Sequence, residues 1–595
     1  MLILKGLTSR LSGMSKGRQF AVIIGVALMV ATVASLATWL LFFQRPAHHQ
    51  WQLVVTAPLS GPEKPHGEAM VRGVELLVQQ INQAGGIAKR PLVLETIDEA
   101  ADPAEVSRQL QRLHGAHDLI GTVGYWSAVS ARNQLPEHAR LHIPAVLLSS
   151  STRGVIPENG WGFHLLPDET SELRFLANYI RNVIGEKIVF VLHPSGEWGE
   201  GLATTWDEVY QRFGTKTLYK WSYSPQAQDL DEEMRRIVAE INEKKLFGTY
   251  LVLGDTRDSA RIIATLRQAG VVRQRVVGMH ALADNSFVTT FGQFWKGRGS
   301  VAAALNGMIV TTPMLYDTSG ESAQSFRNAY FARFKNWPDW VSAYAHDGAN
   351  LLVTTFMELV RQAPRASDEE LREQLRTTLA GMNKIDTAFP GINGSLFFND
   401  AGRAVRSVMP GLYDGDKLVA AHTQLSPIHD EGVANFLDEV TAGRALYVND
   451  RFMYKTNVIY TGVRIEKILS LDPAANIAEI DFSLWFRWRG ESDPSDVVFT
   501  NAATPMTLPA PSKEGKDGDI RYRAYRLKGK FFLNHSNASR SYGTQIAGVS
   551  FRHRLLSRNN LMYVNDLLGG NPEELTSARQ AVVRDAAGII PPTDG

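Results

Sequence analysis

The sequence predicts an α/β protein with two lobes of parallel sheet, an antiparallel β domain after them, and one N-terminal transmembrane helix. Short apolar runs alternate with amphipathic helical patterns from Trp51 to about residue 425, which is typical of parallel sheets covered by helices on both faces. After residue 425 the pattern changes to β-like alternation. The run from Phe20 to Phe43 carries no charge, and about 20 apolar residues are enough to cross a bilayer.

The apolar run near the N-terminus predicts a membrane anchor at residues 20–43. Basic residues cluster before this run, and only Arg45 follows it closely, so the positive-inside rule places residues 1–19 in the cytoplasm. A cleaved signal peptide is the alternative, because the segment Ala-Ser-Leu-Ala at 34–37 offers small residues. Signal peptides have a shorter apolar region, of about 7–15 residues, which favours the anchor. We therefore expect a single-pass membrane protein with most of the chain outside the cytoplasm.

Composition excludes several classes of function. The 595 residues include 62 basic and 61 acidic side chains, for a net charge of +1, so nothing favours a nucleic-acid partner. The chain has no cysteine, which excludes disulfides, thiolate catalysis and cysteine-ligated metals. P-loop, GxGxxG and HExxH motifs are absent. His138 and His142 have metal-ligand spacing but no evident third ligand. We therefore expect no enzyme activity, cofactor or metal site.

The apolar runs also locate individual elements. Glycines at 85–86 end a helical pattern over 67–83, and Asp102 with Pro103 begins another helix. The segment HPSGEWGEGL at 193–202 connects a predicted strand to a helix expected over 203–213. The predicted strands are 52–57, 91–97, 119–123, 145–148, 188–192, 249–253, 275–279 and 307–311.

Six segments carry a resemblance to a known family. They are the stretch beginning PLSGPEKPHGEAM, IPAVLLSSST, GEWGEGLA, LRQAG, NGMIVTTPMLYD and GINGSLFFNDAG. In this order they resemble the type I periplasmic binding proteins of ABC uptake systems for branched-chain amino acids, amides or urea. The resemblance implies two Rossmann-like lobes, three hinge crossovers and a ligand closed between the lobes without chemistry. It implies a first lobe at about 51–168 and 316–395, and a second lobe at about 169–312 and 396–425.

The resemblance also implies which loops of the first lobe hold the ligand. One is the polar loop after the strand at 119–123, and the other is the hydroxyl-rich loop after the strand at 145–148. Hydroxyls and free N–H groups at such positions suit a carboxylate or amide oxygen. Capping of the next helix is the alternative role for the hydroxyls. The expected residues are Tyr125, Trp126, Ser127, Ser149, Ser150, Ser151 and Thr152.

The second lobe is expected to contribute Trp198, Asp255 and His280. Trp198 stands where the family usually carries an aromatic residue; packing in the core is the alternative. Asp255 is placed to receive a cationic group or to cap the next helix. The family's amino-acid binders show an acidic residue after the strand at 275–279, whereas this chain has no carboxylate until Asp284. An amino acid, an amide, a urea-like molecule and an organic acid therefore all remain as candidate ligands.

The C-terminal part is expected to be a connector at 426–455 and a β-rich domain at 456–595. The segments VRIEKILSLDPAANIAEIDFSLWFRWRG and SYGTQIAGVSFRH resemble the extracellular ligand-binding domain of pentameric ligand-gated channels. The paired loop cysteines of that family are absent here. The sheet looks incomplete at the end of the chain, so the sequence predicts either a fragment of a longer protein or a degenerate sandwich.

Together these features predict a membrane-anchored solute-binding protein that captures a small amino-acid- or amide-like ligand by lobe closure. The resemblance implies an inner-membrane permease as partner, in an ABC-type uptake system. With the anchor, it implies a single-pass protein of the bacterial inner membrane with most of the chain in the periplasm. The alternative is a sensory receptor in which the β domain relays ligand binding to a signalling protein. The predicted membrane anchor and the additional β domain favour the receptor, because transport alone requires neither of them.

Overall fold

The computed structural model describes most of the chain after residue 49. The predicted cytoplasmic tail at 1–19 and the predicted anchor at 20–43 lie outside the described residues. Within the described residues, no helix combines the length and apolar character that crossing a membrane requires. The described ranges are 50–115, 118–149, 160–214, 217–225, 228–270, 275–428, 436–449, 451–490, 492–535, 545–556 and 560–567.

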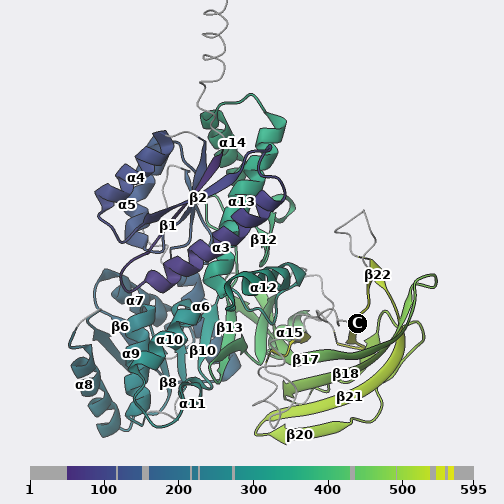
Figure 1. Ribbon diagram of the computed structural model, residues 1–595. Coiled ribbons are helices and arrows are strands. Elements are labelled where there is room, and N and C mark those ends of the chain that lie inside the picture. Colours follow the sequence, from purple (N-terminus) through teal and green to yellow (C-terminus); the bar gives the residue numbers. More distant parts are fainter. Residues whose placement is uncertain are drawn as a thin grey trace, which may run out of the picture.

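The first lobe is a parallel five-stranded sheet in the order β2-β1-β3-β4-β5, at the top of Figure 1. Helices α3 and α13 pack closely because α3 has a glycine at the contact: a Cβ on Gly73 would lie 2.1 Å from the Ser342 carbonyl oxygen. The strands are β1 (Trp51–Ala57), β2 (Leu92–Asp98), β3 (Leu119–Gly124), β4 (Ala145–Leu147) and β5 (Gly162–His164). The helices are α3 (Lys64–Gln83), α4 (Pro103–Gly115), α5 (Ala128–Arg140), α13 (Trp340–Gln362) and α14 (Asp368–Gly381).

The second lobe has a seven-stranded sheet in the order β14-β13-β10-β9-β8-β6-β7. Its strands are parallel except at one edge, where β13 runs antiparallel to β10 and to β14. The strands are β6 (Val189–Pro194), β7 (Tyr219–Tyr223), β8 (Thr249–Val252), β9 (Val276–Gly278), β10 (Ile309–Thr312), β13 (Met409–Asp414) and β14 (Lys417–Ala420). The helices are α6 (Glu169–Tyr179), α7 (Glu197–Arg212), α8 (Leu230–Glu243), α9 (Thr256–Gln268), α10 (Asn285–Phe294) and α11 (Val301–Leu305).

Shorter elements complete these two lobes. The π-helix η1 (Ile180–Ile184) extends α6, the 3₁₀ helix η3 (His280–Leu282) follows β9, and η4 (Ile385–Thr387) lies near the hairpin of β11 (Phe389–Gly391) and β12 (Gly394–Leu396). Helix α12 (Glu321–Phe334) contacts α3. All the strands predicted up to residue 311 are present, with ends shifted by one or two residues.

One expectation about the second lobe was wrong: the helix after β6 begins at Glu197, not near residue 203. The turn before it is made by Gly196, whose φ of 93° suits glycine. Glu197 and Glu200 place negative charge at the positive end of the helix. A Cβ at Gly199 would lie 1.8 Å from the Pro194 carbonyl oxygen. The glycines around Trp198 thus allow the helix to start immediately after the strand.

The β domain is a curved sheet at the lower right of Figure 1. Its long strands are antiparallel in the order β15-β17-β18-β21-β20, whereas β25 pairs with β17 in parallel. The sheet begins earlier than expected, because β15 and β16 lie before or within the predicted connector. The strands are β15 (Thr423–Pro427), β16 (Ala445–Val448), β17 (Arg451–Asp472), β18 (Ile477–Arg489), β20 (Lys513–Asp517), β21 (Ile520–Phe532) and β25 (Leu561–Asn565).

The β domain has its own aromatic core. Phe482 and Phe531 lie with ring centroids 5.5 Å apart, and Phe486 lies 6.1 Å from Phe551. Smaller elements flank the sheet: α15 (Phe436–Thr441), the pair β19 (Val497–Phe499) and β24 (Phe551–His553), and the pair β22 (Asn534–His535) and β23 (Gln545–Ile546). The predicted likeness to the channel domain stays a prediction.

The β domain is packed against the second lobe. An apolar cluster joins Leu315 and Val419 to Val458, Tyr460 and Val564. The Tyr460 hydroxyl donates to the Ala420 carbonyl oxygen. These contacts fix the long strand β17 directly to the edge of the lobe-two sheet.

Candidate functional site

A pocket lies between the two lobes, where the strands of both sheets end. We call it the cleft pocket. Glu63 and Trp126 contribute the wall from the first lobe, and Glu169 comes from the start of α6 at the crossover between lobes. The remaining lining comes from the second lobe: Trp198, Leu202, Gly254, Asp255, Thr256, Met279, His280 and Ala281. Of the predicted ligand residues, the fold therefore brings Trp126, Trp198, Asp255 and His280 together.

Trp126 is held rigidly in the first-lobe wall. Its backbone N–H and that of Ser127 each donate to Glu99 Oε1 at 3.1 Å. Its indole Nε1 donates to Glu63 Oε2 at 3.1 Å, and the ring is stacked on His66 with centroids 4.3 Å apart. Trp340 lies 5.8 Å from the same ring. The indole therefore presents a fixed edge to the pocket, with Glu63 beside it.

Trp198 is a half-buried residue in the first turn of α7. Its Nε1 donates to both carboxylate oxygens of Glu169 at 3.2 Å, so the indole and the carboxylate are oriented together at the pocket wall. The ring also packs against the core cluster of the second lobe. The two alternatives considered for this tryptophan, cleft wall and core residue, thus both describe part of its surroundings.

Asp255 lies at the end of the loop after β8. Its side chain accepts from the Asp258 backbone N–H at 2.8 Å and caps α9, and the same residue lines the pocket. Burial, together with the negative charges of Asp258 and, across the cleft, of Glu63, raises the pKa of Asp255 to about 6. A positive charge placed in the pocket would relieve this repulsion.

His280 is 5% exposed and begins the 3₁₀ turn after β9. Its Nδ1 lies 2.6 Å from Glu172 Oε2, and its backbone N–H donates to Glu172 Oε1 at 2.9 Å. Burial opposes protonation, but the charge of Glu172 holds the pKa of His280 above its ordinary value. The other ring nitrogen, Nε2, is buried without a hydrogen-bond partner among the described residues, which leaves a polar atom for a ligand.

A buried ion pair joins the two lobes beside the cleft pocket. His66 Nε2, on α3 of the first lobe, lies 2.9 Å from Asp284 Oδ2, at the N-cap of α10 in the second. Burial acts against the imidazolium, yet Asp284 and Glu63 together raise the pKa of His66 to about 10. Asp284, the first carboxylate after the strand at 275–279 in the sequence, therefore pairs across the lobes instead of lining the pocket.

Three other predicted ligand residues that the structure describes, Tyr125, Ser127 and Ser149, do not line the pocket. Tyr125 is fully buried and its hydroxyl bonds His138 Nε2 at 2.8 Å, so its side chain points into the lobe core. Ser127 caps α5 by accepting from the Ser130 N–H, which was the alternative considered for such hydroxyls. Ser149 is buried with its Oγ 3.0 Å from His164 Nε2. Ser150, Ser151 and Thr152 lie outside the described residues.

Two acidic residues of the pocket were missed by sequence reasoning. Glu63 lies in the segment PLSGPEKPHGEAM that carried the resemblance, immediately before Lys64 and Pro65 at the start of α3. Glu169 begins α6, next to its N-cap Asp168. The available signal was an acidic residue at a helix start that follows a strand or crossover, where side chains face the cleft.

The lining is chemically one-sided. Glu63, Glu169 and Asp255 supply carboxylates, Trp126 and Trp198 supply indoles, and no lysine or arginine is found among the described residues that line the pocket. Carboxylates and aromatic rings stabilise an ammonium group. No group of three or more potential metal ligands occurs in the part of the chain that the structure describes.

Two lobes, each built on a mainly parallel sheet and with a polar pocket between them, define a two-lobed solute-binding protein. A family model described as periplasmic binding protein matches residues 50–411, which is more than half of the chain. The chain belongs to this family, as the resemblance predicted.

Curated relatives and solved structures agree with this membership. The chain is 27% identical over 224 residues to Leu/Ile/Val-binding protein homolog 3 of Brucella melitensis, a match covering 37% of this chain and 60% of that protein. It is 23% identical over 336 residues to an amino acid binding protein of Pseudomonas aeruginosa, covering 56% and 85%. The fold matches LivJ of Streptococcus pneumoniae in complex with isoleucine, with a TM-score of 0.53 and 17% identity, over 62% of this chain and 98% of that chain. All are named as binding proteins and not as enzymes, in agreement with the sequence prediction.

Proposed function

We propose that the chain is the solute-binding component of an ABC-type uptake system and that its ligand carries an ammonium group. The observation that carries this proposal is the cleft pocket, with carboxylates contributed from both lobes and no lysine or arginine among the described residues that line it. Amino acids, amino-acid amides and other small amines fit this lining better than organic acids. The membrane anchor, the periplasmic location and the permease partner predicted from the sequence belong to the same proposal.

A cationic ligand also explains how closure is triggered. Glu63 on the first lobe and Asp255 on the second repel one another across the pocket. An ammonium group between them replaces repulsion with attraction, and therefore favours the closed arrangement only when ligand is present. Closure of two lobes about a hinge is the usual conformational change in such proteins.

A thermal-shift screen of the purified full chain tests the ligand class. Amino acids, amides, simple amines and organic acids are compared at equal concentration, because a ligand of the folded state raises the unfolding temperature. We expect stabilisation by ammonium-bearing compounds. Stabilisation by organic acids alone would refute the assignment. Uptake of the identified ligand by cells with and without the chain then tests the transport role.

A sensory receptor is the second candidate, favoured by contacts between the β domain and the segments that connect the lobes. Asn449, in the turn between β16 and β17, donates from Nδ2 to the Ser171 carbonyl oxygen at 2.8 Å. Arg451 Nη2 donates to Ser407 Oγ at 2.8 Å. Both partners lie near crossovers between lobes, where closure alters the backbone. Hydrogen exchange measured with and without ligand tests this role: unchanged protection in β16 and the start of β17 would refute the relay.

A further inference from the structure

A second pocket lies at the other end of the lobe-two sheet, between that lobe and the β domain. We call it the junction pocket; its volume is about 610 Å³, within the range of small-molecule sites. Arg275 precedes β9, whereas His280 of the cleft pocket follows the same strand. The two pockets are therefore separated by the length of a strand, and they do not share lining residues.

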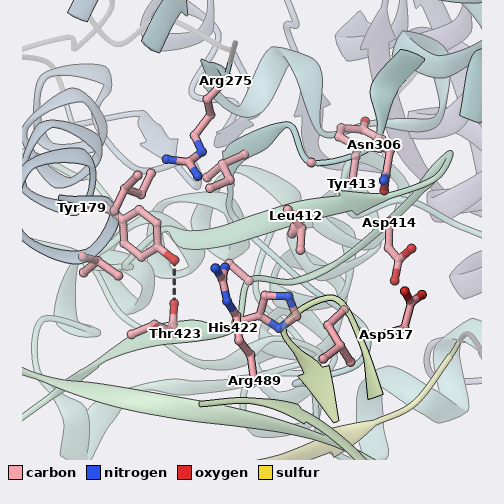
Figure 2. Close-up of a pocket in the computed structure, with 16 residues that line it drawn as sticks. Tyr179, Arg275, Asn306, Leu412, Tyr413, Asp414, His422, Thr423, Arg489 and Asp517 are labelled. Carbon is pink, nitrogen blue, oxygen red and sulfur yellow. Dashed lines mark hydrogen bonds between the residues drawn. The ribbon is translucent and has the colours of Figure 1, made fainter. Parts of the chain in front are cut away.

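Positive groups from two parts of the chain face this pocket. Figure 2 shows Arg275, from the second lobe, and Arg489, from the end of β18, entering from opposite sides, with His422 beside Arg489. Arg275 Nη1 has a carboxylate partner, Glu186, at 3.4 Å, and Arg489 Nη2 has one, Asp519, at 2.7 Å. A guanidinium group has five N–H donors, so each retains donors for a ligand.

His422 marks the inner end of this positive region. Its Nδ1 is buried without a hydrogen-bond partner among the described residues, and its ring lies edge-on to Tyr460 with centroids 5.7 Å apart. Burial, followed by the charges of Arg487 and Arg489, lowers the pKa of His422 to about 4. The imidazole is therefore neutral near pH 7 and lies in a positive electrostatic field.

The remaining lining limits the kind of ligand. Val183, Ile184 and Leu412 add an apolar surface. Asp414 and Asp517 point toward one another on the opposite side from Tyr179 (Figure 2), and Asp414 Oδ2 is paired with Arg487 Nη1 at 3.1 Å. A polyanion would be repelled on that side, whereas a single carboxylate next to the arginines would not.

We propose that the junction pocket binds a small organic monocarboxylate, with its oxygens between Arg275 and Arg489 and its apolar part against Val183, Ile184 and Leu412. Guanidinium groups bind carboxylates through paired hydrogen bonds. Because the two arginines belong to different parts of the chain, the ligand joins the second lobe to the β domain. The site thus provides a second small-molecule input, distinct from the cleft pocket.

Thermal unfolding of the full chain with phenylacetate, at constant ionic strength against chloride, tests this site. The variants are Arg275→Gln and Arg489→Gln, with Arg554→Gln as the matched control, because Arg554 is also half-exposed and paired with a carboxylate, Asp496, at 2.8 Å. We expect a saturable stabilisation of the wild type and of R554Q, with half-saturation at least tenfold weaker in R275Q and R489Q.

Three results with the wild type and the arginine variants would overturn the proposal. They are no stabilisation of the wild type, equal half-saturation in all variants, or an equal effect of inorganic phosphate, which lacks the apolar part. The Asp255→Asn variant locates the effect: it alters the cleft pocket only, so the response to phenylacetate should persist in it. Loss of the response in D255N but not in R275Q would assign phenylacetate to the cleft pocket and also refute the junction site.

Discussion

The cleft pocket and the junction pocket lie at opposite ends of one sheet and differ in their charged groups, because among the described residues arginine lines only the second. Three carboxylates and two indoles line the first, which is bordered by the buried His66–Asp284 pair. Two partly exposed arginines, an imidazole and two aspartates line the second, and the arginines pair with the partly exposed carboxylates of Glu186 and Asp519. Charges next to the cleft are therefore desolvated, whereas those of the junction are screened by water.

This difference shows how one lobe can offer two kinds of site. The cleft pocket is formed at the carboxyl ends of the parallel strands, where helix starts and loops deliver acidic residues. The junction pocket exists only because the β domain covers the opposite end of the sheet. Its ligand affinity should depend on the contact between domains, whereas the affinity of the cleft should depend on lobe closure.

Removing the buried cation beside the cleft should have the largest effect. His66→Ala leaves Asp284 buried without its partner, which costs about 3–5 kcal/mol of unfolding free energy; denaturant titration measures it. Arg489→Gln removes an exposed pair at the junction and should cost about 0–1 kcal/mol. The double variant H66A/D284A should recover part of the loss, because Asp284 is then no longer left as an unpaired buried charge. If H66A and R489Q lowered the unfolding free energy equally, the contrast between buried charges at the cleft and exposed charges at the junction would be wrong.

Asp255→Asn should weaken an ammonium ligand by about 1.5–3 kcal/mol, the range for hydrogen bonds to charged groups. Asparagine retains an oxygen for the α9 cap, so stability should change little. Isothermal titration calorimetry measures the affinity, and Arg275→Gln serves as the junction control. An R275Q variant that lost cleft affinity to the same extent would show that the two pockets are not independent.

Trp198→Ala should weaken binding in the cleft by about 1–3 kcal/mol, the value of a lost buried aromatic contact. Trp206, on the same helix but fully buried, provides the contrast: W206A should lower stability by about 3–5 kcal/mol. If calorimetry finds the same ligand affinity in W198A as in the wild type, the Trp198 indole contributes to packing and not to binding.

The smallest effect on ligand binding should come from protonation of Asp255. The pKa of Asp255 is about 6 without ligand, so its carboxylate is ionised at pH 7 and becomes protonated as pH falls through 6. Affinity for an ammonium ligand should therefore decrease below pH 6, by at most about tenfold per pH unit for one proton. The D255N variant should lose this pH dependence of the affinity. If its affinity decreases below pH 6 as in the wild type, another group is responsible for the decrease.

The stability contributed by His66 should depend on pH in the opposite sense. Its pKa is about 10 in the folded state against an ordinary value of 6.5. The contribution is therefore complete below pH 6.5 and is lost as pH rises through 10. Wild-type stability should fall over this window more steeply than that of H66A.

Much of the fold and part of the site could be predicted from the sequence. Apolar runs such as 188–192 and glycine pairs such as 85–86 act locally, so strands and helix ends were found to within a few residues. The motifs also placed Trp198 and Asp255 at strand ends that face the cleft. The start of α7 was missed because it depends on Gly196 and Gly199, whose backbone geometry leaves little trace in hydrophobic periodicity.

By itself, the sequence determined the alternation of elements, the family and the loops that meet at the cleft, because these depend on local patterns and short motifs. Only the tertiary structure decided which side chains converge. Glu63 and Asp255 are far apart in the chain but face one pocket, and Asp284 pairs with His66 across the lobes. Tyr125 and Ser149 are instead turned into the first lobe. Charge pairing and burial act through space, between residues whose separation along the chain carries no information about their contact.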